Sequence, residues 1–552
     1  MTIHDPAAAA MAFENATAVI ARGEFKVGFR DALMALALNP AVDSHRRLAL
    51  SYFRVMSGYR RLPDAVVSAL EHCTNDPSFD LQPLAMVVRE ILPHDPRMKA
   101  MMGLSWSVPQ VIEDAIQSDE LTWFFEHRLL RAALGRAVNI SDHVEWVLMK
   151  LRRHALLWQD GRGTPSALVS KHPAFASAMA RQSHLCAFPW IETPEETAAV
   201  LRHVLTPSAA LIVAMYRPVE DQHAEQAQAL PLDLSELRCT RLARSEAQTT
   251  IRELTPVADV TSRAVARQYH SHPYPPWDAP VGIGETSNWN EIVADMRRRP
   301  DGYPSLQAVP ARILIAGCGT GFGAVVAAQN APEAEITAID LSRTSVAYAM
   351  EKADRFAPGR IRFGVGDILN VTALGQWFDF IECSGVLHHM ANPIDGLATL
   401  TQVLRAGGRM KIGLYSKRGR RSVTAAREWI RLLGWRDVPV GLRGARSALR
   451  SLDEGHPARP VTHMVDFYSL DALHDLLFNV MEHCFTPVDL KGLLAQTGLE
   501  FLGFDLNPMR AATVDLPQGA AALELDAWDA VEELHPDLFA EMFHFWVRKS
   551  WD

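Results

Sequence analysis

The stretch ILIAGCGTGFG, residues 313–323, decides the fold of the C-terminal half of this chain. It reads as a short apolar strand that ends in Gly317, Gly319 and Gly321 and passes into the helical run AVVAAQN. Glycines let the backbone turn tightly and approach a ligand without a Cβ atom in the way, and the following helix directs its amino terminus at that ligand. The stretch predicts a cofactor-binding βαβ unit. Alone it does not distinguish one cofactor class from another.

Two acidic residues further along the chain narrow the prediction. Asp340 ends the next strand-like run, EITAIDL, where a carboxylate can accept hydrogen bonds from both hydroxyls of a ribose. Asp367 and Ile368 end a third run, IRFGVGD, where a carboxylate and a neighbouring backbone NH can frame the edge of an adenine. The spacing predicts a site for an adenosine-containing cofactor.

Short β-rich runs alternate with helical ones from about residue 313 onward. The runs are RILIAGC, EITAIDL, IRFGVGD, FDFIECSG and RMKIGLYS, followed later by LEFLGFDL and MFHFWVRKS. Such alternation is typical of an open, mostly parallel sheet wound with helices. The first 250 residues instead show apolar positions three and four apart, as in Phe29, Leu33 and Leu36, and predict helices. We therefore predict a Rossmann-like α/β domain with seven strands, preceded by an all-α region.

The chain is too long for one hydrophobic core, so we divide it into three parts. Residues 1–160 are predicted to form a helical domain, with a tetratricopeptide-like repeat as one interpretation of its start. Residues 161–255 form a second helical region, in which Thr193 precedes a proline and two glutamates that favour a helix start. Residues 256–552 form the α/β domain, with a basic insertion at 416–450 and last strands near 499–506 and 543–549.

Composition excludes several functional classes. A net charge of -9 argues against bulk attraction to nucleic acid, and no apolar run is long enough to cross a membrane. The first residues lack the pattern of a secretory signal, so we expect a cytoplasmic protein. The six cysteines are scattered without metal-binding spacing, which favours reduced thiols and predicts no metal site.

Together these motifs resemble those of class I S-adenosylmethionine-dependent methyltransferases over roughly residues 262–552. The resemblance implies S-adenosyl-L-methionine as the cofactor, with the glycine loop beside its methionine part and the two strand-end acids on its ribose and adenine. One position departs from the family pattern: many members have an acid where this chain has Ile315, so recognition of the cofactor's amino group is expected to use other residues. The cofactor-binding residues predicted on this basis are Gly317, Cys318, Gly319, Thr320, Gly321, Asp340, Leu341, Asp367, Ile368, Ser384 and Leu387.

The aromatic segment, QYHSHPYPPW at residues 268–277, lies shortly before the glycine strand. It resembles a tyrosine-rich segment in large bacterial proteins that join helical, tetratricopeptide-like regions to methyltransferase domains. Two interpretations stay open: a packed linker between domains, or a lid over cofactor and substrate. We name Tyr269 and Tyr274 as candidate catalytic residues and Trp277 as a candidate substrate contact.

His388 and His389 follow the fourth strand, whose carboxyl end faces the ligand in this architecture. The pair is shared by family members with different substrates, which favours a structural role in the pocket over proton transfer. In-line placement of a desolvated nucleophile supplies much of the rate of methyl transfer, so no base is obligatory. If the acceptor is a hydroxyl, a histidine or Tyr415 is a candidate base.

The basic segment, residues 416–450, contains ten basic and two acidic residues. It follows the fifth strand and so leaves the sheet at the ligand-binding edge. Two roles are open: its arginines, Arg420 and Arg421 among them, contact an acidic acceptor, or they pair with acidic helices of the same chain. No other feature of the sequence suggests a nucleic-acid acceptor, and we do not favour that acceptor.

The methyl acceptor is not fixed by these motifs. We favour a protein or peptide, because a small metabolite hardly requires about 250 additional residues, and we expect those residues to select the acceptor and to contribute little to cofactor binding. The alternative is a quinone-like, lipid-linked or other small-molecule acceptor. A catalytically silent cofactor-binding scaffold and a nicotinamide oxidoreductase are the alternatives from other classes. The sequence leaves the oligomeric state open.

Overall fold

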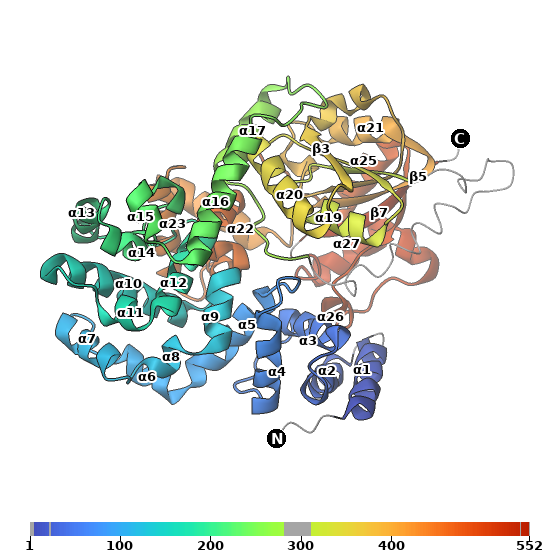
Figure 1. The fold of residues 1–552 in the computed structure, drawn as a ribbon. Helices are drawn as coiled ribbons and strands as arrows, with labels where there is room; N and C mark the ends of the chain where they lie inside the picture. The colour runs from blue at the N-terminus through green and yellow to red at the C-terminus, as the bar shows by residue number, and fades with distance from the viewer. Residues whose placement is uncertain (1–4, 21–23, 281–310, 541, 551–552) are drawn as a thin grey trace.

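The computed structural model describes residues 5–20, 24–280, 311–540 and 542–550. Figure 1 shows a layered helical region, which carries the N-terminus, beside a domain built on a central sheet. Helices α16 and α17 lie where the two meet. The architecture confirms the prediction of a Rossmann-like domain that follows a largely helical region.

The N-terminal region is helical, as the apolar spacing predicted. Its helix boundaries follow local capping signals: Ser141 accepts a hydrogen bond from the Val144 amide at the start of α10, and Gly163 ends that helix with a left-handed backbone. Thr193 and Glu196 form a capping box at the start of α13. The α-helices are α1 (Pro6–Ile20), α2 (Phe25–Leu38), α3 (Asp43–Val55), α4 (Asp64–Thr74), α5 (Gln82–Ile91), α6 (Pro96–Met102), α7 (Pro109–Gln117), α8 (Thr122–Phe125), α9 (Arg128–Arg136), α10 (Asp142–Arg162), α11 (Ala167–Lys171), α12 (Pro173–Leu185), α13 (Pro194–His203), α14 (Ala210–Val213), α15 (Ala224–Gln228), α16 (Leu232–Ala247) and α17 (Val260–Ser271).

The sheet has seven strands in the order β3-β2-β1-β4-β5-β7-β6. All neighbouring pairs are parallel except those with β7, which runs antiparallel to both β5 and β6. Parallel strands end at a common edge, so the residues that follow β1 to β4 come together there. The strands are β1 (Arg312–Ala316), β2 (Glu335–Asp340), β3 (Ile361–Val365), β4 (Phe378–Ser384), β5 (Leu404–Leu414), β6 (Leu499–Phe504) and β7 (Phe543–Lys549).

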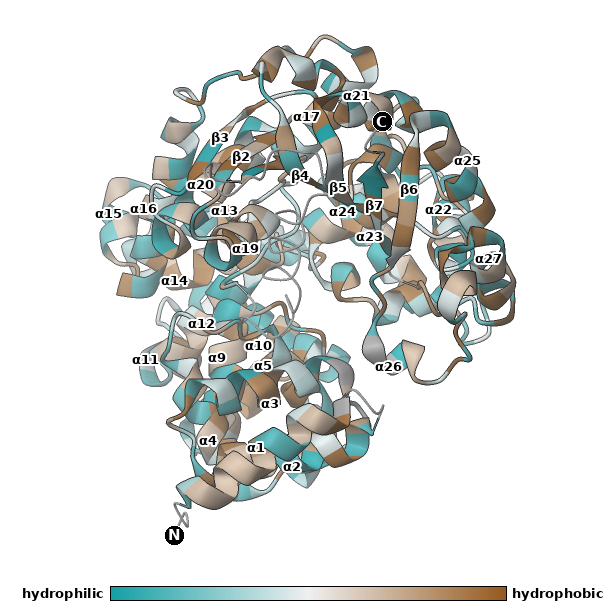
Figure 2. Cartoon of the chain, turned by 90° about the vertical axis from the view of Figure 1, so that its right-hand side faces the viewer, coloured by the Kyte–Doolittle hydropathy of each residue, from teal (hydrophilic) through white to brown (hydrophobic). Residues whose placement is uncertain are grey.

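Helices cover both faces of the sheet, and alternate residues of β1 belong to different cores. Ile313 and Ile315 pack with helices α19 and α20, whereas Leu314 and Ala316 pack with the core that contains α21, α25 and α27. In Figure 2 helices α25 and α27 carry both brown and teal segments, as expected for helices with one buried side. These helices are α19 (Phe322–Asn330), α20 (Arg343–Phe356), α21 (Pro393–Val403), α25 (Pro487–Thr497) and α27 (Leu525–Leu534), and a short helix α26 (Pro508–Ala511) follows β6.

The segment between β5 and β6 packs with the N-terminal helices. It forms α22 (Arg421–Leu432), α23 (Pro439–Arg450) and α24 (Leu470–Phe478). In Figure 1, α22 and α23 appear in the helical half of the molecule, near α14 and α16. Val423, Leu442 and Leu473 are fully buried in the same core as the helical region. The division predicted from the sequence assigns the basic segment to the α/β domain as an insertion, and its helices share the core of the helical region. The apolar faces of α22 and α23 need a partner surface, and the N-terminal helices provide it.

Within the described ranges, no helix is both long and apolar enough to span a bilayer. All six cysteines are free.

Candidate cofactor and acceptor site

The glycine loop joins β1 to α19 in a backbone conformation that residues other than glycine rarely adopt. Gly317 and Gly321 have φ angles of +76° and +89°, in the left-handed region. A Cβ atom at Gly321 would overlap the side chain of Ala349 in α20, and one at Gly317 would overlap Val386. The loop is therefore closed against both α20 and the turn after β4, and glycine is required for these contacts.

Asp340, at the end of β2, braces the glycine loop. One carboxylate oxygen accepts a hydrogen bond from the Gly319 amide and the other from the Ser342 amide, each at 2.8 Å. Burial raises the pKa of Asp340, and the two amides oppose that shift. The side chain lines the cavity described below, where a carboxylate retains lone pairs for ribose hydroxyls. The contact with Gly319 gives this acid a structural role that the sequence did not predict.

Asp367 follows β3 and is almost completely buried. Its Oδ1 accepts a hydrogen bond from the Leu369 amide at 3.0 Å. The Thr255 hydroxyl donates to the Asp367 carbonyl and accepts from the Asp367 amide. Its Oδ2 has no hydrogen-bond partner in the described part of the chain. Burial raises the pKa of Asp367 despite the opposing Leu369 amide and Ser262 hydroxyl. A buried acceptor without a partner is costly, so Oδ2 is suited to a donor such as an adenine amino group.

These residues line a cavity of about 300 Å³ at the carboxyl edge of β1 to β4. Of the predicted cofactor residues, Gly321 and Leu387 are outside its lining. Gly321 caps helix α19, and Leu387 belongs to the core under the sheet. The predicted residues that line the cavity are Gly317, Cys318, Gly319, Thr320, Asp340, Leu341, Asp367, Ile368 and Ser384, together with Tyr269, Tyr274 and His389.

The two adjacent histidines occupy different environments. His388 is fully buried against the Tyr415 ring, with 3.9 Å between ring centroids, and neither ring nitrogen has a partner among the described residues. His389 lines the cavity, and its Nδ1 donates to the Met481 carbonyl at 2.7 Å. Burial lowers the pKa of both imidazoles, so both are neutral near pH 7. Because Nδ1 of His389 carries the proton, its lone pair is on Nε2.

The tyrosines of the aromatic segment donate to carboxylates beyond the sheet domain. Tyr269 donates to Asp475 of α24 at 2.5 Å, and Tyr274 donates to Asp466 at 3.2 Å. Burial raises the pKa of both phenols well above the usual value, and the carboxylates add to the shift. Both phenols therefore stay protonated at neutral pH and act as oriented dipoles beside the cavity.

Trp277 contacts the outside of the glycine loop. Its indole NH donates to the Thr320 carbonyl at 3.0 Å, while the Thr320 hydroxyl donates to the Pro275 carbonyl at 2.5 Å. The ring meets Phe322 edge to face. Trp277 supports the loop from outside the cofactor cavity lining, and it lines the second cavity described below.

The three other predicted substrate residues also lie outside this lining. The Arg420 guanidinium stacks over the Tyr415 ring at 3.6 Å and pairs with Glu482 at 2.6 Å. Arg421 pairs with Asp537 at the surface. Four further arginines of the basic segment also bind acids of this chain: Arg418 binds Asp529 and Glu532, Arg427 binds Glu482, and Arg446 and Arg450 bind Glu145. Of the two roles predicted for this segment, these contacts favour pairing within the chain.

A second cavity of about 300 Å³ lies on the other side of the aromatic segment. Tyr274, Pro275 and Phe322 line both cavities, so the segment is a shared wall. The helical region contributes Arg54 and Arg136 to the second cavity, and α24 contributes Ser469 and Ala472 as it begins. Residues of the helical region and of the start of α24 thus line a cavity that shares the aromatic segment with the cofactor cavity.

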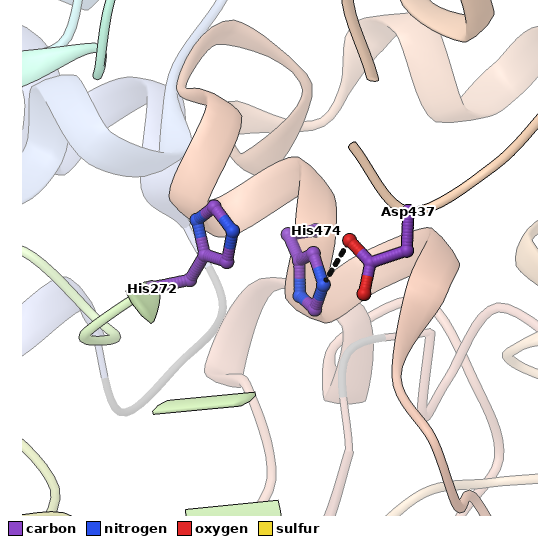
Figure 3. A group of neighbouring side chains, drawn as sticks. All are labelled: His272, Asp437 and His474. Carbon is purple, nitrogen blue, oxygen red and sulfur yellow. Dashed lines mark ion pairs between the residues drawn. The ribbon is translucent and has the colours of Figure 1, made fainter. Parts of the chain in front are cut away.

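Figure 3 shows His272, Asp437 and His474, which bring three potential ligand atoms within 4.8 Å of one another. The two imidazole rings are stacked, with 4.3 Å between centroids and 14° between planes. A histidine lone pair lies in its ring plane, so two nearly parallel planes do not direct their lone pairs at one ion about 2.0–2.1 Å from each nitrogen. His474 instead pairs with Asp437 at 2.8 Å, and His272 pairs with Asp471 at 2.7 Å. The group fastens the aromatic segment to α24.

Sequence reasoning missed several residues that line the cofactor cavity, including Ser262 and Val265 of α17, Glu382 of β4 and Met390. The α17 residues precede the glycine strand by some 50 positions, and no spacing rule connects them with it. Glu382 had a detectable signal, because it is a charged residue inside an otherwise apolar strand run, FDFIECS.

Comparisons with known proteins agree with this geometry. A family described as "Methyltransferase domain" (Methyltransf_25) matches residues 313–408. An uncharacterized protein of Synechococcus sp. is 32% identical over 259 residues, 45% of this chain and 60% of that protein. The demethylmenaquinone methyltransferase of Deinococcus radiodurans is 32% identical over 113 residues, 20% of this chain and 46% of that one. This chain thus spans about half to three fifths of these curated relatives.

Among solved structures, PKMT2 from Rickettsia typhi in complex with AdoHcy is 18% identical, covering 51% of this chain and 55% of that one, with a TM-score of 0.38. A similarity at that level establishes no shared function. The family match, residues 313–408, runs from β1 into β5 and includes the glycine loop, Asp340 and Asp367 of the cofactor cavity. The C-terminal region of this chain belongs to the class I S-adenosylmethionine-dependent methyltransferases.

Proposed function

We propose that the whole protein transfers the methyl group of S-adenosylmethionine to a protein or peptide acceptor that the helical region helps to select. The observation that carries the proposal is the shared wall of the two cavities, Tyr274 and Pro275. One side of this wall faces the cofactor residues, and the other faces the helical region. An acceptor held by the helical region therefore has only this segment between it and the cofactor site.

The cofactor residues fit an adenosine sulfonium compound. Asp367 offers a buried, unpartnered oxygen for the adenine amino group, and Asp340 offers a carboxylate for the ribose hydroxyls. Glycines at the loop leave the backbone open to the ligand. When bound, S-adenosylmethionine supplies an electrophilic methyl group on a positively charged sulfur. The chain must then hold the nucleophile in line with that methyl group and exclude water.

His389 is the candidate base for an acceptor that must lose a proton. The Met481 carbonyl fixes the ring by accepting from Nδ1, which leaves the neutral Nε2 free to take a proton. Tyr269 and Tyr274, each held by a carboxylate, orient the acceptor through their hydroxyl oxygens. His388 is fully buried, so we assign it to the support of His389 and Tyr415.

A small-molecule acceptor is the second candidate. The Deinococcus radiodurans relative is a demethylmenaquinone methyltransferase, and its match spans 20% of this chain. In this alternative the acceptor occupies the cofactor cavity itself, beside Tyr269 and Met390. The helical region then closes the site.

Transfer of labelled methyl groups tests these assignments. The full chain is incubated with methyl-labelled S-adenosylmethionine and a cell extract, which is then separated into macromolecules and small molecules. Label on protein that is lost with His389→Gln supports the favoured acceptor class. Label confined to small molecules supports the second candidate. Cofactor binding by calorimetry without label in either fraction contradicts both and indicates a silent scaffold.

A further inference from the structure

Glu382 is a charged residue in the middle of the sheet. It lies on β4, in register with Ile315 of β1 on one side and Lys411 of β5 on the other. Neighbours in register on parallel strands direct their side chains to the same face. Glu382 therefore stands beside Ile315, at the carboxyl end of β1 just before Gly317, and both residues line the cofactor cavity.

Among the described residues, the Glu382 carboxylate has no partner in direct contact. Within the described ranges it makes no hydrogen bond or ion pair, and Lys411 is engaged with Asp505 at 2.8 Å. Burial raises the pKa of Glu382, and the more distant Lys411 only opposes that shift. A partly buried anion without a partner reduces stability, which is tolerated most readily where a ligand completes the site.

The carboxylate also lies beside the start of α19. A Cβ atom built on Gly323, in the first turn of that helix, would be 3.3 Å from Glu382 Oε1. The absence of a side chain at Gly323 gives the carboxylate its room, and the amino end of a helix favours a negative charge there. The carboxylate thus occupies a defined place on the cavity wall, beside the first turn of α19.

The order of the strands indicates which part of the ligand lies near Glu382. Along the carboxyl edge, Asp367 follows β3, Asp340 ends β2, the glycine loop follows β1 and Glu382 lies on β4. Adjacent strands are about 4.8 Å apart, so Glu382 is separated from Asp340 by roughly 10 Å across the glycine loop. An adenosine held by Asp367 and Asp340 must extend its 5′ substituent across the loop toward β4. In S-adenosylmethionine that substituent ends in an amino acid with a positively charged ammonium group.

We propose that Glu382 binds the α-ammonium group of the cofactor and takes the place of an acid at position 315. The inference rests on the proposed function, because it requires an adenosyl amino acid in this cavity. The carboxylate supplies a charge-assisted hydrogen bond, and the ammonium group neutralises an anion that no described residue pairs with. Glu382 is then a residue that distinguishes adenosyl amino acids from simple thio-nucleosides.

Calorimetry on the full chain tests this with two ligands that differ in the amino acid. S-adenosylhomocysteine carries the ammonium group, and 5′-methylthioadenosine has the same adenosine and sulfur without it. Loss of a charged hydrogen bond weakens binding by roughly tenfold to a hundredfold. We expect Glu382→Gln to weaken S-adenosylhomocysteine by that factor and to leave 5′-methylthioadenosine unchanged.

Moving the acid separates a specific contact from general damage to the pocket. The double variant Ile315→Glu, Glu382→Ile places the carboxylate on the neighbouring strand, and we expect it to regain part of the preference for S-adenosylhomocysteine. Equal weakening of both ligands by Glu382→Gln, or no weakening of either, would overturn the assignment. Failure of the unaltered protein to bind any of the adenosyl ligands would instead overturn the proposed function.

Discussion

The cofactor side of this site and its proposed acceptor side are built in different ways. On the cofactor side, Asp340 and Gly319 are bound to each other within one βαβ unit. On the acceptor side, Tyr269 meets Asp475 and Tyr274 meets Asp466, partners about 200 residues away in the chain. Local geometry fixes the first set of contacts, whereas the second depends on how the helical region and the segment after β5 pack together. Changes in the two parts should therefore have separable effects.

The largest effect is expected where the two regions are joined. Glu145 of α10 binds Arg446 through two hydrogen bonds of 2.6 and 2.7 Å, and both side chains are at most 4% exposed. Glu145→Gln leaves the buried Arg446 without its anion, which costs about 3–5 kcal/mol of folding free energy. Thermal unfolding measures the loss. Asp142→Asn on the same helix is the control, because Asp142 is 60% exposed and its loss should cost less than about 1 kcal/mol.

The same contact gives the stability a dependence on pH. Burial would raise the pKa of Glu145, but Arg446 and Arg450 outweigh it and lower the pKa to about 2. A carboxylate with a lowered folded-state pKa stabilises the protein above its unfolded value and loses that contribution as the pH falls toward about 2. We expect the difference in melting temperature between the unaltered protein and Glu145→Gln to shrink below about pH 4.3, the unfolded value of a glutamate. A constant difference down to pH 2 would show that the charge of Glu145 is not responsible.

The next effect concerns the cofactor side alone. Asp340→Ala removes the proposed ribose contact and the brace of the Gly319 amide, so S-adenosylmethionine binding should weaken by about 1.5–3 kcal/mol. Calorimetry measures the affinity, and the melting temperature of the ligand-free protein shows whether the fold persists. Glu351→Ala, at the partly buried contact between α20 and Arg244, serves as a control outside the cavity. Unchanged affinity in a folded Asp340 variant would remove Asp340 from the cofactor site.

A smaller effect is expected on the acceptor side. Tyr274→Phe removes one hydrogen bond to Asp466 and leaves the ring in the wall between the cavities. Because a side-chain hydrogen bond contributes about 1 kcal/mol, we expect a severalfold rise in the acceptor KM with unchanged cofactor affinity. A change in cofactor affinity of the same size would mean that Tyr274 belongs to the cofactor side.

The contrast also explains which features the sequence could predict. The seven strands, the glycine loop, Asp340 and Asp367 follow from short-range patterns, and the structure has the strands where the runs predicted them. The Thr193 helix start was predicted for the same reason. The partners of Tyr269 and Tyr274 were beyond such reasoning, because no local pattern reports which distant carboxylate a side chain will meet. The sequence shows Glu382 only as a charged residue in an apolar strand, and the strand register was needed to place it beside Ile315.

The role of the helical region is the point at which the structure changes the expectation most. The sequence suggested that the first 250 residues contribute little to cofactor binding. Yet Val423 and Leu473, in the segment that supplies the partners of the tyrosines, are buried in the core of that region. Arg343 of α20 also donates to the carbonyl of Gln248 at 3.5 Å. The segment that supplies the partners of Tyr269 and Tyr274 therefore depends on the N-terminal helices for its packing.

The smallest effect is predicted for the surface of the basic segment. Arg421 is 53% exposed and pairs with Asp537, itself 75% exposed, so Arg421→Glu should change stability by less than about 0.5 kcal/mol. If this surface receives an acidic acceptor, the same variant should raise the acceptor KM and weaken its dependence on salt. If the segment serves only to join parts of the chain, both should stay as they are. Arg420 is the informative contrast, because it is buried on Tyr415 and Glu482, and Arg420→Glu should lower the melting temperature whether or not an acidic acceptor binds. The other arginines of the basic segment that bind Glu145 and Glu482 serve contacts within the chain. We therefore expect the same of Arg421, and no change in the acceptor KM from Arg421→Glu.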